Sequence, residues 1–120
     1  MIAKKIKSSS VDRKDAANYL QRSRELLESM RNNVILENWN AVVIDAVHSA
    51  ISANDAITVA AIGKRCTSSH HLDAVELLKQ SVHKDELKEL SRLRQIIHIK
   101  SHVEYGPSLV SGKEAQKVVQ

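Results

Sequence analysis

The sequence predicts an all-α protein, an antiparallel, up-and-down bundle of four to five helices. The first observation behind this prediction is the run at residues 39–62, which consists mostly of Ala, Val and Ile and therefore favours helix. The second is that apolar residues elsewhere recur at helical spacing. The third is the scarcity of helix breakers: three Gly and one Pro in 120 residues leave few turns for a β fold.

The length predicts one domain, which we place at residues 12–120 after a flexible basic arm at residues 1–11. The opening segment MIAKKIKSSS is too short and too polar for a signal peptide. The single Cys66 excludes an internal disulfide and suits a reducing compartment, so we expect a cytoplasmic protein. No long apolar run lacks polar interruptions, so no membrane association is expected.

The first helix is expected over residues 12–32. Its apolar stripe repeats every seven positions, at Leu20, Leu27 and Val34. Asn32 and Asn33 favour a turn, so they predict the end of this helix.

The second helix is expected over residues 38–62, with Gly63 as its stop signal. Apolar residues lie on nearly every side of it, which is typical of a helix surrounded by other helices. Four polar residues interrupt the pattern at intervals of three, four and three positions, which places them on one stripe. They are Asp45, His48, Ser52 and Asp55.

This polar stripe has two interpretations. In the favoured one it is a seam that fixes the register of packed helices; in the other it is the floor of a cleft between the second and fourth helices. Buried ionisable groups need partners, and Asp45 and His48 are spaced to pair with each other. The candidate partners of Asp55 are four cations: Lys64, Arg65, Arg94 and Lys100.

The remaining helices are predicted from capping signals. A third helix at residues 69–82 can be capped by the Thr and Ser residues before it. A fourth, at residues 84–105, ends before Gly106 and Pro107. Ser111 and Glu114 form a capping box that opens a last helix at residues 111–119. So short a helix is marginal alone, so it must dock on the others.

Four segments together resemble the HEPN superfamily of helical-bundle domains: ENWNAVVIDAVHSAISANDAITVAAIGKR, SSHHLDAVELL, RLRQIIHIKSHVEYG and SGKEAQKVV. The resemblance spans residues 15–119 and implies a bundle of four or five helices that is often dimeric. HEPN domains occur as ribonucleases, as toxins paired with antitoxins and as partners of small nucleotidyltransferases. The resemblance therefore implies a module that engages RNA, a nucleotide, or a nucleotidyltransferase or antitoxin partner.

HEPN ribonucleases carry an Arg followed, after four to six residues, by a His. Arg92 and His98 fit this pattern, and Arg94 shares a helix face with His98. A His can act as acid or base near pH 7 and an Arg can stabilise phosphate charge. The sequence departs from the active pattern at Leu93, where active members usually carry a polar residue. A metal-independent endoribonuclease using Arg92, Arg94 and His98 is thus the enzymatic alternative.

The same segment carries a basic stripe that can follow phosphates. Its nucleic-acid-binding candidates are Arg94, Lys100 and His102. The scarcity of aromatic residues argues against a dedicated single-strand binder, so a solvated helix face is the alternative. His98 and His102 have metal-ligand spacing but no evident third ligand, so no metal and no cofactor are expected.

A homodimer is predicted because Ile96 and Ile99 lie beside the inner stripe of the fourth helix. Exposed together, they would form an apolar patch that meets itself in a symmetric dimer. Such a dimer would bring two His98 side chains near one axis. The third functional alternative is a purely structural protein-interaction domain.

Overall fold

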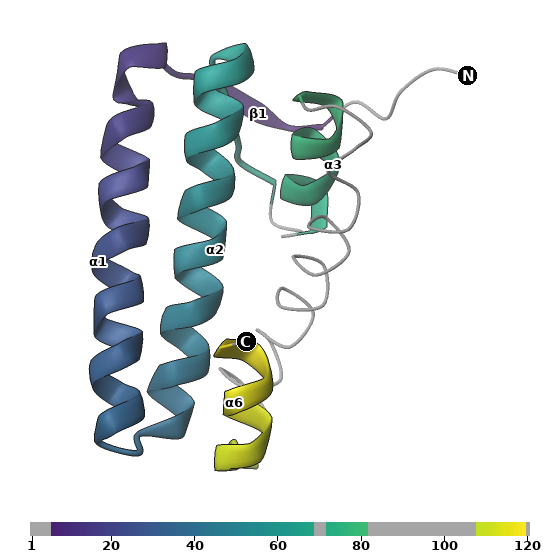
Figure 1. The fold of residues 1–120 in the computed structure, drawn as a ribbon. Coiled ribbons are helices and arrows are strands. Elements are labelled where there is room, and N and C mark those ends of the chain that lie inside the picture. Colours follow the sequence, from purple (N-terminus) through teal and green to yellow (C-terminus); the bar gives the residue numbers. More distant parts are fainter. Residues whose placement is uncertain (1–5, 69–71, 82–107, 120) are drawn as a thin grey trace.

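The computed structural model describes residues 6–68, 72–81 and 108–119, and these residues are predominantly helical, as predicted. Two long helices lie side by side, and two shorter ones lie beside the second of them (Figure 1). The described elements, in chain order, are β1 (Ser8–Ser10), the 3-10 helix η1 (Arg13–Asp15), α1 (Ala16–Ile35), α2 (Trp39–Ile62), β2 (Lys64–Cys66), α3 (Leu72–Ser81) and α6 (Gly112–Val119). The helix predicted at residues 84–105 lies outside the described residues.

Helices α1 and α2 form an antiparallel hairpin (Figure 1). Helix α2 has almost the predicted bounds, and Gly63 ends it in the left-handed conformation, with φ of 64°. Helix α1 does not end at Asn32, so that prediction was wrong. The side chain of Asn33 bonds to Asp45 of α2, and the chain turns later, at Glu37, whose φ is 57°.

The segment before α1 is not a free arm over the whole of residues 1–11. Ser8–Ser10 pairs antiparallel with Lys64–Cys66, and the backbone N–H of Thr67 donates to the carbonyl of Lys7. Ile6 is buried. The predicted arm was therefore wrong for residues 6–11, because backbone pairing holds a segment whose side chains show no strand pattern; residues 1–5 lie outside the described part.

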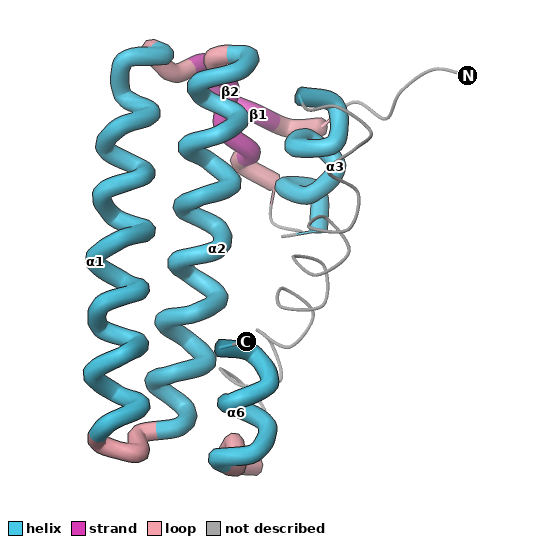
Figure 2. Tube along the Cα trace, in the orientation of Figure 1, coloured by secondary structure: helices cyan, strands magenta, loops and turns pink. Residues whose placement is uncertain are grey.

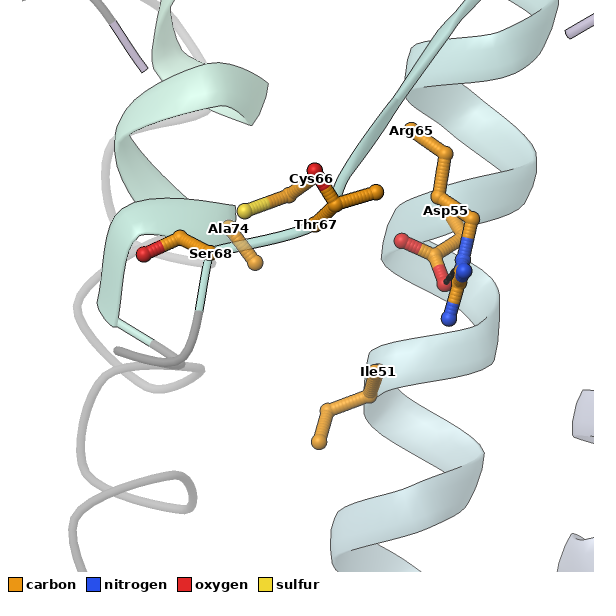
Figure 3. Close-up of a pocket in the computed structure, with 7 residues that line it drawn as sticks. All are labelled: Ile51, Asp55, Arg65, Cys66, Thr67, Ser68 and Ala74. Atoms are coloured by element: carbon orange, nitrogen blue, oxygen red, sulfur yellow. Dashed lines mark hydrogen bonds and ion pairs between the residues drawn. The ribbon is translucent and has the colours of Figure 1, made fainter. Parts of the chain in front are cut away.

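Helix α3 runs in the same general direction as α2, as Figures 1 and 3 both show. The reason is β2, which carries the chain back alongside α2 before α3 begins (Figure 2). The start of α3 is attached to α2 by a hydrogen bond of 3.1 Å from Asn54 Nδ2 to the carbonyl of Ala74. The antiparallel order expected of consecutive helices therefore applies to α1 and α2 but not to α2 and α3.

The main apolar cluster lies around the first half of α2, where α1 and α6 cover it. Its buried members are Met30, Val42, Val43, Ala46, Val47 and Ala115. Helix α6 approaches closely because Gly112 faces the Trp39 ring: a Cβ at Gly112 would lie 3.0 Å from Cε2 of Trp39.

The predicted capping box opens α6. The backbone N–H of Glu114 donates to Ser111 Oγ at 3.2 Å, and the Ser111 hydroxyl donates to Glu114 Oε1 at 3.0 Å. This confirms the capping prediction and places the helix start at Gly112. Within the described parts of the chain, no helix combines the length and the apolar character that a membrane crossing requires.

Candidate functional site

Asp45 belongs to a seam between α1 and α2. Its Oδ2 accepts hydrogen bonds from Ser29 Oγ at 2.7 Å and from Asn33 Nδ2 at 3.0 Å, both on α1. These bonds satisfy a half-buried carboxylate and tie the two helices together at one register. At Asp45 the polar stripe thus has the geometry of the seam interpretation.

A second polar contact in this seam was missed by the sequence analysis. Ser23 Oγ donates to the carbonyl of Ser49 at 2.9 Å, and Ser49 Oγ donates to the carbonyl of Ser23 at 2.8 Å. Both serines are buried. The reciprocal bonds let two helix backbones approach closely, and nothing in a single serine distinguishes this role from a surface position.

His48 and Ser52 lie half-buried on α2 between Asp45 and Asp55. The four residues of the stripe therefore do not converge on one centre. Asp45 bonds to α1, whereas Asp55 lies ten residues further along α2 and faces a different partner.

Asp55 forms the charged contact of this region. Its Oδ2 accepts a hydrogen bond from Arg65 Nε at 3.1 Å, so one of the four predicted cations is its partner. The Asp55 side chain is 7% exposed and that of Arg65 is 45% exposed. Burial raises the pKa of the Asp55 carboxyl, while the hydrogen bond and charge of Arg65 and the charge of Arg22 partly oppose the rise.

The ring of Tyr19 on α1 lies close to two arginines near Asp55, Arg22 and Arg65. The guanidinium carbons of Arg22 and Arg65 lie 5.2 Å and 5.9 Å from the centre of its ring. At these distances each cation is attracted by the face of the ring. Arg65 of β2 is therefore held from one side by α1 and from the other by α2.

A pocket of about 220 Å³ lies next to this ion pair. Its described lining comes from α2, from β2 with the loop after it, and from α3, as Figure 3 shows. The lining residues are Ile51, Asp55, Arg65, Cys66, Thr67, Ser68 and Ala74. Asp55 thus lines a pocket whose described walls are β2 and α3. The predicted cleft with the fourth helix lies outside the described residues.

Cys66 is half-buried on the wall of this pocket. Burial raises the pKa of its thiol, and the nearby carboxylates of Asp73 and Asp55 add to the rise. Since the thiolate is the reactive form, this rise disfavours Cys66 as a nucleophile. The neighbouring Ser68 hydroxyl donates to Asp73 Oδ2 at 2.7 Å, at the start of α3.

Asn54 is the one buried polar side chain among the described residues with an unsatisfied atom. It is 2% exposed, and its Oδ1 has no hydrogen-bond partner while its Nδ2 donates to Ala74. An orphaned amide oxygen costs free energy. The half of α2 that faces α3 is therefore less well satisfied than the half that faces α6.

An apolar end is formed where the α1–α2 turn lies near the segment that enters α6 (Figure 2). The backbone N–H of Val110 donates to Asn40 Oδ1 at 2.8 Å, which holds this segment against the start of α2. We define the apolar end by three side chains that are 80%, 66% and 82% exposed: Ile35, Leu36 and Leu109.

The predicted catalytic and RNA-binding residues lie outside the described part of the chain. This applies to Arg92, Arg94, His98, Lys100 and His102. In the ranges that are described, no three His, Cys, Asp or Glu side chains are grouped to hold a metal ion. The chain matches no protein-family model and no curated protein.

Proposed function

We propose that this chain is a helical interaction module that self-associates through the apolar end. The observation that carries the proposal is the exposure of three aliphatic side chains in segments at one end of the helical hairpin: Ile35, Leu36 and Leu109 are 80%, 66% and 82% exposed. Single exposed aliphatic residues are ordinary on protein surfaces, but exposed apolar surface that gathers at one place is typical of a contact surface, and we propose that these three side chains supply it.

The charges around the apolar end favour a second copy of the chain as the partner. Exposed residues of both signs lie within five positions of it along the chain: Arg31 and Lys113 are basic, and Glu37 and Glu114 are acidic. In a two-fold symmetric contact each surface meets itself, so a mixed rim can pair its own opposite charges. A nucleic acid would instead favour a rim of one positive sign.

The finer part of the proposal rests on the family resemblance. It is that residues 84–105 complete a HEPN-type antiparallel bundle, and that the module engages RNA, a nucleotide or a nucleotidyltransferase-like or antitoxin partner in the cytoplasm. Arg94, Lys100 and His102 are the residues proposed to contact nucleic acid. The enzymatic alternative keeps Arg92, Arg94 and His98 as a metal-independent ribonuclease site.

Self-association is tested by measuring mass in solution. Light scattering after size exclusion should give a dimer for the parent at tens of micromolar, and a monomer for Leu36→Lys and Leu109→Lys. Ile57→Lys is the matched control, because Ile57 is 45% exposed on α2 far from the apolar end and its variant should remain dimeric. A monomeric parent, or a dimer that survives both apolar-end variants, would contradict the proposal.

RNA engagement is tested separately. Labelled RNA is incubated with the parent and with His98→Ala, without metal. Cleavage that disappears in His98→Ala would establish the ribonuclease, whereas binding that weakens with salt and occurs without cleavage would favour the RNA-engaging module. If the parent neither cleaves nor binds the RNA, the purely structural interaction domain is the remaining alternative.

A further inference from the structure

The ion pair in the pocket uses only part of its hydrogen-bonding capacity. An Arg and a carboxylate often form two parallel hydrogen bonds that engage both carboxylate oxygens. Here the contact is a single one, from Arg65 Nε to Asp55 Oδ2. Among the described residues nothing donates to Asp55 Oδ1, and Figure 3 shows this second oxygen turned away from Arg65, toward the pocket.

Arg65 likewise retains unused donors. Its Nε is engaged by Asp55, but its two Nη groups donate to no acceptor in the described ranges 6–68, 72–81 and 108–119. The side chain is 45% exposed and its guanidinium is fixed by the Tyr19 ring on one side and Asp55 on the other. The pocket wall therefore presents an acceptor and a set of donors next to each other.

Among the described residues, charges of both signs act on the lining of the pocket. Besides Asp55 and Arg65, two further described residues act on these groups: the charge of Arg22 acts on Asp55, and that of Asp73 acts on Cys66. Two positive and two negative groups favour a ligand without net charge over a phosphate or a polyamine. The apolar part of the lining comes from Ile51 and Ala74.

We propose that this pocket binds a small zwitterion with a short aliphatic group, of which an α-amino acid is the simplest example. Its ammonium group would donate to Asp55 Oδ1, its carboxylate would accept from the Nη groups of Arg65, and its aliphatic part would contact Ile51 and Ala74. The volume of about 220 Å³ is below the roughly 300–1,000 Å³ of pockets for drug-sized ligands, so the ligand is smaller than those. This site is independent of the self-association proposed above.

The test is calorimetric titration of the full chain with L-alanine or L-valine. Propionate and ethylamine are matched probes that each carry one of the two charges. We expect a saturable heat for at least one of the two amino acids, and binding about tenfold weaker or more for either single-charge probe, because each loses one charge-assisted contact.

Substitutions test whether the amino acid binds in this pocket. Arg65→Gln should abolish it, and circular dichroism of the variant checks that the loss of this partner of Asp55 leaves the fold intact. Ala74→Leu should abolish it by filling the pocket while the ion pair remains, whereas Ala60→Leu, the same change at an exposed residue of α2, should bind as the parent does. Binding of neither amino acid at millimolar concentration, equal binding of propionate, or binding that survives Ala74→Leu would overturn the proposal.

Discussion

The two halves of α2 are both rich in aliphatic residues but have different surroundings. In the first half, Val42, Val43 and Val47 are almost fully buried in the apolar cluster with α1 and α6. In the second half, Asn54, Asp55 and Thr58 are buried as deeply, beside β2 and α3. The comparison shows that the burial of a helix face is not enough to predict its role. The first half is buried in an apolar core, whereas the second half buries polar side chains beside a pocket.

The second half of α2, the polar half, loses more free energy through the desolvation of buried polar groups than the first half, the apolar half. Buried polar groups need partners to offset their desolvation. Asp55 obtains one from Arg65, whereas Asn54 leaves its Oδ1 unpaired. Local departures from full satisfaction concentrate at functional places, which is why we place the ligand site in this half and not in the apolar one.

The largest expected effect breaks the apolar half. Met30→Ala should lower the free energy of unfolding by about 2–5 kcal/mol, because Met30 is 5% exposed and its truncation leaves a cavity in the cluster. Urea unfolding followed by circular dichroism measures the loss. Leu20→Ala on the same helix is the control, since Leu20 is 40% exposed and should lose much less. Equal losses would mean that the cluster is not the packed core of this half.

A smaller effect is expected at the seam between α1 and α2. Ser23→Ala and Ser49→Ala should each cost about 0.5–1.5 kcal/mol, because each removes a buried hydrogen bond to the opposite helix. The two losses should not add in the double variant, since the hydroxyl groups also lie 3.1 Å from each other. Strictly additive losses would show that the two contacts act independently.

The smallest effect is a pH dependence in the polar half. The pKa of Asp55 is raised by burial above its ordinary 3.8, so as pH rises from that value the unfolded chain releases the proton first. The folded state then holds more protons, and the free energy of unfolding contributed by Asp55 falls until the raised pKa has been passed. Urea unfolding at several pH values should show the parent losing stability relative to Asp55→Asn as pH rises; a relative gain would contradict the raised pKa.

The sequence predicted the helical elements best where local signals are strong. Gly63 ended α2, and the Ser111–Glu114 pair opened α6, because both signals act within one helical turn. The end of α1 was predicted too early, because the Asn33 amide bonds to Asp45 twelve residues away. Strand β1 was missed because a run of three serines carries no alternating pattern and gains its partner only 54 or more residues later.

The candidate site was only partly visible in the sequence. The polar stripe singled out Asp45 and Asp55, and Arg65 was among the partners considered for Asp55. The pocket itself could not be predicted. Cys66 and Thr67 line it because β2 and the loop after it run back alongside α2, and Ala74 lines it because α3 then runs in the same direction as α2. These are consequences of topology, which side-chain spacing along one helix does not contain.

The pairing of β1 with β2 also decides how the molecule can come apart. At one end of the α1–α2 hairpin, the turn before Trp39 joins the two helices covalently. At the other end, β1 pairs with β2, and the backbone N–H of Val11 donates to the carbonyl of Gly63. Residues 6–68 therefore form a closed ring, and α1 cannot swing away from α2 without first breaking the sheet. Arg65 and Cys66 of β2 also line the pocket, so separation of β1 from β2 would remove a support of the proposed binding site. We therefore expect the loss of this strand pairing and the loss of the site to occur together.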